Sequence, residues 1–406
     1  MAHSVLGSVT LGYELIWNQK RRCSGVRLFV EAQSQSSVDA KHLVAAITEL
    51  WPESAPTLLL HVQSPALLSG LLDHAPARGI WLEIQAHWLS DALLAGRVRK
   101  ARERGLPLVW HGEPGQAPDA SMESLFHKTL RTLSPHEALA ALRVSLRQHQ
   151  DGGVGTASAG HSTVVTGSLY EGLASQALLE HALDRQGVAG VAGWPAEEIL
   201  HAYRFRLIQP SQRLLRALVK AVEADESLES LEHRMGDEPL LTYRFLRYAN
   251  SAHLGARSEV TSVRQGLMVM GYTKLRSWLM EQIPHASSDP NLDPILFAMV
   301  LRARIMERLA DAGVEDDLRR EVFLCGIFSQ LDLLLGEPLG VAIHRLPMPG
   351  RIASAVVGQT GPYAPWLEVA AALESGNTRM IRDVCKAHNM PADEVNRALL
   401  RTLGAL

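Results

Sequence analysis

The sequence is poor in cysteine and in aromatic residues, and it has no strong excess of charge of either sign. Its three cysteines, Cys23, Cys325 and Cys385, stand far apart and form no CxxC pair. That spacing argues against a structural zinc site and a disulfide framework, and it is typical of a reducing cytoplasm. The formal net charge is −3, so the composition indicates neither nucleic acid nor an anionic membrane as a partner.

The sequence also lacks a long apolar run and a leader-like beginning. No stretch approaches the roughly 20 apolar residues that a membrane-spanning helix needs. The opening MAHSVLGSVTLGYEL contains no basic region and reaches Glu14 too early for a signal peptide. We therefore expect a cytoplasmic protein that does not engage a membrane. Its 406 residues exceed what one core usually holds, so we expect two domains.

What the first half does contain is an alternation of strand-like and helix-like segments. The candidate strands are VTLGYELIW (9–17), VRLFVEA (26–32), TLLLHV (57–62), IWLEIQ (80–85), LPLVWH (106–111), STVVTG (162–167) and GVAGW (190–194). The candidate helices are 37–50, 87–105 and 134–150. This alternation predicts a parallel sheet or a β/α barrel. Because it ends near residue 199, short of the roughly 250 residues of a typical eight-stranded barrel, we expect a reduced or irregular barrel over residues 1–199.

Two segments of this half have a recognisable local chemistry. The helix at 134–150 begins with Ser134, Pro135 and Glu137, which form a capping box with proline at the first helical position. The glycine-rich DGGVGTASAG (151–160) follows a helix and precedes a strand-like run. A dinucleotide-binding loop needs the reverse order, so we predict a plain connecting loop.

The second half has a different pattern, in which helix after helix begins at a cap or a proline and ends at glycine. One such segment begins at Asp293-Pro294 and ends at Gly313, and the next ends at Gly336. Asn377 is placed to cap TRMIRDVCKAHN. Residues 200–406 are therefore predicted to form an all-α domain with a C-terminal helical extension.

One carboxylate, Glu14, interrupts an otherwise apolar candidate strand. A buried, unpaired carboxylate costs several kcal/mol, so Glu14 should be a ligand, a paired group or a solvent-facing residue. Its segment GYELIWN resembles the signature strand of EAL domains, the β/α barrels that hydrolyse cyclic di-GMP, in which this Glu is a metal ligand. By the same resemblance, the ligand positions of the next two strands fall on His61 in LLLHVQS and on Glu83 in WLEIQ. Asn18 stands where the family has Arg.

The residues that complete the EAL metal site are missing from the positions that the resemblance assigns. Trp110 and His111 in PLVWHGEPG stand in place of the family's Asp pair, and the family's loop glutamate falls near Gly167. GVAGWP lacks the family's glutamine, and Lys128 in LFHKTL is the candidate for its lysine. Two-metal hydrolysis needs several oxygen ligands around hard cations. The resemblance therefore implies a barrel that has lost phosphodiesterase activity.

Two interpretations of the remaining polar residues stay open. Glu14, His61, Glu83 and His111 would all lie near strand ends at one side of a barrel, where they could hold one transition-metal ion. Alternatively the histidines occur there by chance, and Glu14 pairs locally or faces water. We expect the second, with no metal and no cofactor.

Residues 223–280 are similar to HDOD domains, through DEPLLTYRFLRYANSA and VTSVRQGLMVMGYTKLR. In these segments Asn250 and Ser251 are predicted to end one helix and Gly271 the next, as helix stops rather than as a site. HDOD domains are named for their likeness to HD phosphohydrolases, which bind metal through His and a His-Asp pair. This chain contains no His-Asp dipeptide. At the expected place, LCGIFSQLDLLLG offers Ser329, Gln330 and Asp332.

The order of the two resemblances, with the trailing GIFSQLDLLLG…ALESGN segment, resembles the YuxH-type EAL–HDOD signalling proteins of bacteria. It implies a non-catalytic signal-transduction adaptor that works through protein–protein interactions with other signalling proteins. The alternative is a receptor that binds cyclic di-GMP or a related nucleotide without cleaving it. The candidate partner surface consists of polar residues beside the YANSAHLG turn: Arg244, Arg247, His253 and Arg257.

Overall fold

The structure, a computed structural model, describes residues 4–33, 38–150, 162–251, 259–310 and 315–406. Contacts within the chain divide it into two compact units. The first comprises Met1–Glu198 together with Ala372–Leu406, and the second comprises Ile199–Ala371. The glycine-rich segment 151–160 lies outside the described residues.

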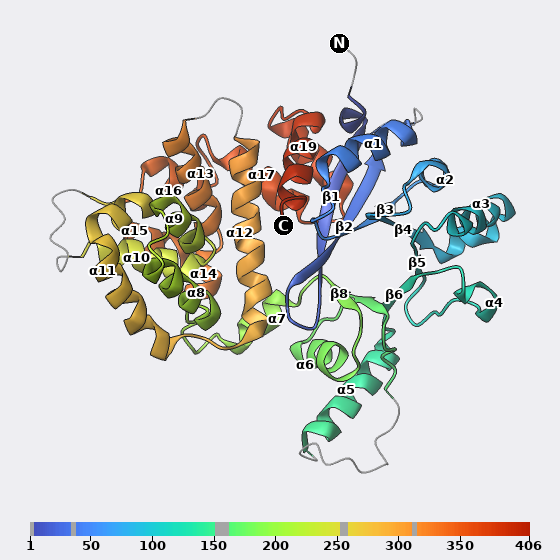
Figure 1. Cartoon of the computed structure of the whole chain (residues 1–406), viewed down its shortest axis with the longest axis horizontal. Helices are drawn as coiled ribbons and strands as arrows, with labels where there is room; N and C mark the ends of the chain where they lie inside the picture. The colour runs from blue at the N-terminus through green and yellow to red at the C-terminus, as the bar shows by residue number, and fades with distance from the viewer. Residues whose placement is uncertain (1–3, 34–37, 151–161, 252–258, 311–314) are drawn as a thin grey trace. The chain divides into compact units, whose positions relative to one another are not determined.

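The first unit is built around eight strands that close into a barrel in chain order (Figure 1). The strands are β1 (Val9–Trp17), β2 (Cys23–Ala32), β3 (Thr57–Val62), β4 (Ile80–Gln85), β5 (Leu108–His111), β6 (Lys128–Thr132), β7 (Leu169–Glu171) and β8 (Gly190–Ala192). β1 runs antiparallel to both of its neighbours, and the other neighbouring strands are parallel. The predicted β/α barrel is confirmed, and the direction of β1 makes it irregular. It closes within about 190 residues because its last two strands have only three residues each.

Helices connect most of these strands. They are α1 (Ala40–Leu50), α2 (Pro65–His74), α3 (Ala92–Glu103), α4 (Ala120–Glu123), α5 (Pro135–Gln150) and α6 (Gln176–Glu180), and α7 (Ala196–Ala202) follows β8. The capping box predicted before α5 is confirmed, because the Ser134 backbone N–H donates to Glu137 Oε2 at 2.9 Å. The strand predicted at 162–167 is wrong: Thr163 instead bonds its hydroxyl to the Glu137 carbonyl of α5.

The interior of the barrel is filled by a layer of apolar side chains, one from most strands. Its buried members are Ile16, Leu59, Val109, Leu130, Leu169 and Ala192, and Trp81 packs against them. Because side chains alternate along a strand, the residues two positions further along also point inward. The apolar layer therefore lies directly beneath a second layer of inward-pointing side chains.

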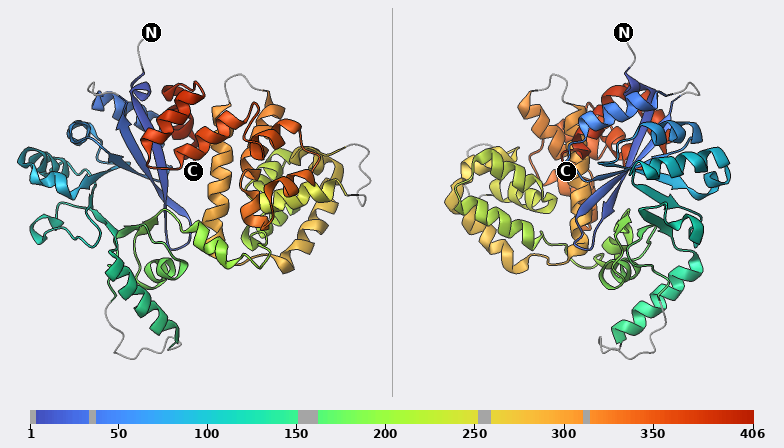
Figure 2. Two further views of the ribbon diagram at one scale, coloured as in Figure 1. Left: turned by 180° about the vertical axis from the view of Figure 1, so that it is seen from behind. Right: turned by 45° about the vertical axis from the view of Figure 1, so that its right-hand side comes forward.

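The last two helices of the chain, α18 (Thr378–Ala387) and α19 (Ala392–Leu403), pack on the outside of this barrel. Figures 1 and 2 show them in red beside the blue β1. The buried Asn396 of α19 donates to the carbonyls of Leu6 and Val9 at 2.8 and 2.9 Å. The approach is close at Gly12, where a Cβ would lie 2.1 Å from the Ser375 carbonyl oxygen. This differs from the predicted division into 1–199 and 200–406, because β1 needs these helices to cover its outer face.

We expect the Asn396→Ala variant to unfold with a free energy about 2 kcal/mol lower than that of the wild type, because the carbonyls of two buried residues each lose a hydrogen bond. Urea unfolding of the full chain measures this difference. Asn377→Ala is the matched control: Asn377 caps α18 by accepting from the Met380 N–H, and its loss should cost only about 1 kcal/mol. Equal effects of the two variants would contradict the proposed anchoring of α19.

The second unit is all-α, as predicted (Figure 1). Its helices are α8 (Gln212–Glu223), α9 (Leu228–Gly236), α10 (Pro239–Ala249), α11 (Val263–Gln282), α12 (Asp293–Leu309), α13 (Asp316–Phe328), α14 (Leu331–Leu335), α15 (Leu339–His344), α16 (Gly350–Val356) and α17 (Ala364–Leu373). α14 ends at Gly336, whose φ of 63° is the left-handed conformation that glycine adopts readily. Within the described ranges, no helix has the length and apolar character needed to cross a membrane.

Candidate functional site

A layer of polar side chains lies directly above the apolar layer of the barrel, at the mouth formed by the carboxyl ends of the parallel strands. Each of its residues occupies an inward position on one strand. Six of them lie two residues from a member of the apolar layer, and Arg27 is the cross-strand neighbour of Glu14. The members are Glu14 (β1), Arg27 (β2), His61 (β3), Glu83 (β4), His111 (β5), Thr132 (β6) and Glu171 (β7).

The centre of this layer is the guanidinium group of Arg27, whose side chain is only 5% exposed. It binds Glu83 with two parallel hydrogen bonds, from Nε to Oε2 and from Nη2 to Oε1, both 2.8 Å long. Its Nη1 lies 2.5 Å from Glu171 Oε2 and 3.4 Å from Glu14 Oε2. One positive group therefore contacts all three carboxylates of the mouth, in the bidentate geometry that arginine favours.

Two imidazole rings complete the layer. His111 bridges two carboxylates, with Nδ1 at 2.6 Å from Glu83 Oε1 and Nε2 at 3.0 Å from Glu171 Oε1. His61 Nδ1 lies 2.8 Å from the same Glu83 oxygen. The Thr132 hydroxyl donates to Glu171 at 2.6 Å. Glu83, which is fully buried, thus has partners on three neighbouring strands.

The electrostatics follow from this network. Burial raises the pKa of Glu83, but the charge of Arg27 and the hydrogen bonds from His111 and His61 outweigh it and hold that pKa well below its usual range. Burial likewise opposes ionisation of Glu171, yet His111 and Arg27 lower its pKa to about 2. Burial disfavours the charged form of His111, but Glu171 and Glu83 raise its pKa to about 9. Burial raises the pKa of Glu14, and its long contact with Arg27 offsets this only in part.

The structure gathers some of the residues singled out in the sequence and separates others. Glu14, His61, Glu83 and His111 share the mouth. Trp110 is buried on the opposite face of β5, since side chains alternate along the strand. Lys128 lies at the other end of β6 and donates to the Gly167 carbonyl at 3.1 Å. Asn18 lies in the turn after β1, where its side chain accepts from the Lys20 N–H.

Sequence reasoning missed three residues of the mouth, Arg27, Thr132 and Glu171. Arg27 points inward from the strand VRLFVEA, between the buried apolar residues Val26 and Leu28. Because side chains alternate along a strand, a charged residue at this place was the signal that could have assigned it to the barrel interior. Glu171 ends β7, a three-residue strand that was not predicted. The family's loop glutamate was expected near Gly167, four residues earlier in the chain.

The residues of the mouth do not fit a pair of hard cations. Two such cations need a set of oxygen ligands that are free to surround them. Here all three carboxylates contact the Arg27 guanidinium, and the other polar groups within reach of Glu83 are two imidazoles and the Gln85 amide. The place of a pair of hard cations is therefore taken by the guanidinium group of Arg27.

In the second unit, Asn250 acts as a clamp. Its Nδ2 donates to the carbonyls of Leu246 and Val260, and its Oδ1 accepts from the Val260 N–H, each at 2.8 Å. The Ser251 hydroxyl donates to the Tyr248 carbonyl at 2.7 Å. At Gly271 the backbone leaves the helical conformation, with φ 68° and ψ 165°, a region that is essentially restricted to glycine.

We expect Asn250→Ala to lower the free energy of unfolding by about 2 kcal/mol, because three hydrogen bonds are lost and the buried Val260 backbone is left without partners. Ser251→Ala, which removes one bond at the same turn, should cost less than about 1 kcal/mol. Urea unfolding of both variants tests this order. If Ser251→Ala proved the more damaging change, the clamp would be refuted.

The residues at the expected HD position have helix-end roles. Ser329 follows α13 and donates its hydroxyl to the Gly326 carbonyl at 2.7 Å, and Gln330 and Asp332 lie at the start of α14. In the described part of the second unit, no three His, Cys, Asp or Glu side chains are grouped as metal ligands would be.

The candidate partner surface is only partly exposed. Arg244 is half-buried and donates to the side chain of Gln209 at 2.9 Å, so it holds the segment before α8. Arg247 is exposed and lies over the Tyr243 ring. His253 and Arg257 lie outside the described residues.

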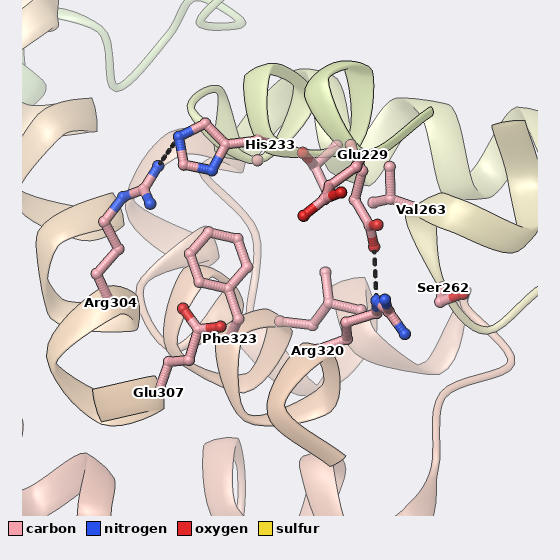
Figure 3. A pocket seen from close by; sticks show the side chains of 12 residues that line it. Glu229, His233, Ser262, Val263, Arg304, Glu307, Arg320 and Phe323 are labelled. Atoms are coloured by element: carbon pink, nitrogen blue, oxygen red, sulfur yellow. Dashed lines mark hydrogen bonds and ion pairs between the residues drawn. The ribbon is translucent and has the colours of Figure 1, made fainter. Parts of the chain in front are cut away.

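The second unit also contains a pocket of about 200 Å³ between α9, α12 and α13 (Figure 3). The ring of Phe323 faces it, between two arginines that are already paired. Arg320 lies 3.2 Å from Glu232, and Arg304 donates to Asp237 at 2.7 Å and contacts His233. The lining therefore combines an aromatic surface with three glutamates and two arginines.

Comparison with known sequences decides the nature of the second unit, since the HDOD domain family matches residues 208–335. The second unit contains an HDOD domain. Its match begins just before α8 and ends with α14. A β/α barrel precedes this domain in the chain, in the order expected from the sequence.

Two curated bacterial proteins are similar to the chain. Uncharacterized protein YuxH of Bacillus subtilis is 25% identical over 144 residues, which are 34% of this chain and 34% of YuxH. Cyclic di-GMP phosphodiesterase CdgJ of Vibrio cholerae is 21% identical over 196 residues, which are 48% of this chain and 45% of CdgJ. The matches thus span between a third and a half of each relative. The name of one relative thus refers to cyclic di-GMP hydrolysis, whereas the other relative is uncharacterized.

Among solved structures, the MmoQ response regulator from Methylococcus capsulatus aligns with a TM-score of 0.39 at 16% identity. The alignment covers 47% of this chain and 97% of the MmoQ chain. With a TM-score below 0.5, this likeness bears on neither the fold nor the function.

Proposed function

We propose that the chain is a non-catalytic signal-transduction adaptor of cyclic di-GMP-related signalling, which works through protein–protein interactions. The observation that carries this proposal is the position of Arg27. Its guanidinium group contacts Glu14, Glu83 and Glu171 at once, in the mouth where a hydrolytic EAL barrel would hold its metal ions. A phosphodiester in this mouth would meet no pair of metal ions to polarise it and no metal-bound hydroxide to attack it.

The HDOD domain supports the same proposal. The residues at its HD position terminate one helix and begin the next, and Asn250 serves the backbone of its own turn. The surrounding helices keep regular caps and buried faces, as a fold retained for its surface would. Grooves between helices commonly receive a helix or peptide of a partner.

Two other functions compete with this one. The first is hydrolysis of cyclic di-GMP, which the name of CdgJ suggests. The second is binding of cyclic di-GMP without hydrolysis, as by a receptor. Calorimetric titration of cyclic di-GMP into the full chain, with and without Mg²⁺ or Mn²⁺, separates all three. We expect no binding heat in either condition. Binding without product would favour the receptor, and binding with product would favour the phosphodiesterase.

The interaction surface can be tested at Arg247, which is the described and exposed arginine of the candidate surface. We expect Arg247→Glu to reduce the amount of a protein partner that the tagged chain retains in a pull-down from bacterial lysate, without lowering the melting temperature. Arg216→Glu on α8, another exposed arginine of the same unit, is the matched control. If retention survives this change but is lost with substitutions in the barrel mouth, the working surface lies on the barrel.

A further inference from the structure

One cluster in the barrel mouth has a geometry that the proposed function does not use. His61, Glu83 and His111 place their ligand atoms within 4.8 Å of one another, and among the described residues they are the group arranged in this way. We propose that this cluster, with Gln85 beside it, binds one divalent transition-metal ion between β3, β4 and β5. The site is distinct from a two-metal hydrolytic centre, because two of its four donors are imidazole nitrogen atoms and Glu14 is not among them. It replaces the expectation from the sequence that the histidines gather by chance.

Four polar atoms converge on one point in this cluster. Glu83 Oε1 lies 2.8 Å from His61 Nδ1 and 2.6 Å from His111 Nδ1. The Gln85 amide nitrogen lies 2.9 Å from the same oxygen, and 3.3 and 3.1 Å from the two Nδ1 atoms. Ligands on a tetrahedral ion with bonds of about 2.0–2.1 Å lie about 3.3 Å apart. Five of the six separations among these atoms thus equal or fall slightly below that value, and the two Nδ1 atoms lie within 4.8 Å of one another. A half-turn of the Gln85 amide presents its oxygen to the ion.

Hydrogen bonds alone do not satisfy this arrangement. Arg27 Nη2 also lies 2.8 Å from Glu83 Oε1, so four nitrogen atoms crowd around a single oxygen. A carboxylate offers about four acceptor positions on its two oxygens together. The Gln85 amide, a donor, moreover faces two Nδ1 atoms, each of which needs its own proton to bond to Glu83. An ion that takes a lone pair from each group removes both conflicts.

The groups around the cluster are those that hold metal ligands in place. His111 Nε2 lies 3.0 Å from Glu171 Oε1, which keeps the proton on that nitrogen and turns the lone pair of Nδ1 toward the cluster. The second oxygen of Glu83 is fixed by Arg27 Nε. The mouth holds three carboxylates against one guanidinium group, and an ion on His111 Nδ1 takes the place of the second proton of that imidazole.

The donor set also selects the class of ion. Imidazole nitrogen suits Zn²⁺, Co²⁺ and similar ions, whereas Mg²⁺ prefers oxygen ligands. With four protein groups around it, the ion has no open position for a substrate or a reactive water, as in structural zinc sites. Its role is then to tie together the ends of three barrel strands, which agrees with a barrel that performs no hydrolysis.

Cobalt(II) titration tests the site, because a four-coordinate Co²⁺ ion absorbs visible light much more strongly than a six-coordinate one. The full chain, without a histidine tag and after removal of metal by a chelator, is expected to bind about one Co²⁺ per chain with this strong absorption. The His61→Ala/His111→Ala variant should lose the absorption and weaken binding more than about 100-fold. His61→Ala alone, at a side chain that is 17% exposed, gives a weaker form of the same result if the double variant does not fold.

His42→Ala is the matched control, since His42 also pairs with a carboxylate, that of Asp39, but lies on the surface of the same unit with 75% of its side chain exposed. It should leave the titration unchanged. Absence of binding, the weak absorption of a six-coordinate ion, or an unchanged titration in the double variant would overturn the proposal. Hydrolysis of cyclic di-GMP by the cobalt-loaded chain would instead refute the proposed function and leave the site standing.

Discussion

The Arg27→Leu variant is expected to lose about 3–5 kcal/mol of unfolding free energy, because it leaves the fully buried Glu83 and two partly buried carboxylates without their shared cation. Leucine is close to arginine in its apolar volume, so the effect reports the lost charge and hydrogen bonds more than a cavity. Native-state hydrogen exchange of the β3 and β4 amides measures it within the barrel itself. Arg27→Lys keeps the charge but loses the two-pronged contact with Glu83, and an intermediate loss is expected.

The matched control is Arg97→Leu in the same unit. Arg97 pairs with Asp73, but both side chains are nearly half exposed, so this ion pair is expected to contribute less than about 1 kcal/mol. A loss at Arg27 no larger than the loss at Arg97 would contradict the role of Arg27 as the cation of the mouth. If Arg27→Leu does not fold, the other two variants still test the role of Arg27. The free energy of unfolding should then be clearly lower than wild type for Arg27→Lys and close to wild type for Arg97→Leu.

The second large effect is expected at Glu238, a buried carboxyl at the N-terminus of α10 in the HDOD domain. Burial raises its pKa to about 7, and the backbone N–H groups of Leu241 and Ser211 only partly oppose this. The folded state therefore binds the proton more tightly than the unfolded state, whose pKa is near 4.3. The stabilising contribution is complete below about pH 4 and is lost as the pH rises through 7. Over that range the loss is about 3 kcal/mol.

Glu238→Gln isolates this contribution, since glutamine keeps an oxygen that can accept from the Leu241 N–H but carries no charge. Urea unfolding at pH 5 and pH 8 is the measurement. The variant should be close to wild type at pH 5 and more stable than wild type at pH 8. If the two proteins lost stability in parallel between these values, another group would be responsible for the pH dependence.

The sequence was most informative where strands are long and mostly apolar. β1, β3 and β4 were predicted with the bounds that the structure shows. β6 and β7 were not predicted because they have only five and three residues, and β6 contains a single apolar residue, Leu130. The segment 162–167, wrongly predicted as a strand, has the composition of one, but Thr163 and Val164 pack in the connection between α5 and β7.

The site shows the same limit. His61, Glu83 and His111 could be placed together because they stand at equivalent positions of consecutive strands. Arg27 could not, because its partners Glu83 and Glu171 are 56 and 144 residues away and only the closed barrel brings them to it. The attachment of α19 to the barrel is also a long-range contact, since Asn396 and Val9 are 387 residues apart. No local sequence pattern predicts it.

The most direct test of the account is a time course of cyclic di-GMP with the full chain in Mg²⁺ and in Mn²⁺, followed by chromatography of the nucleotide. The account predicts no product above the level of a Glu14→Ala/Glu83→Ala variant, because the Arg27 guanidinium holds the carboxylates that metal ions would need. Product that forms with the wild type and disappears with this double variant would contradict the account.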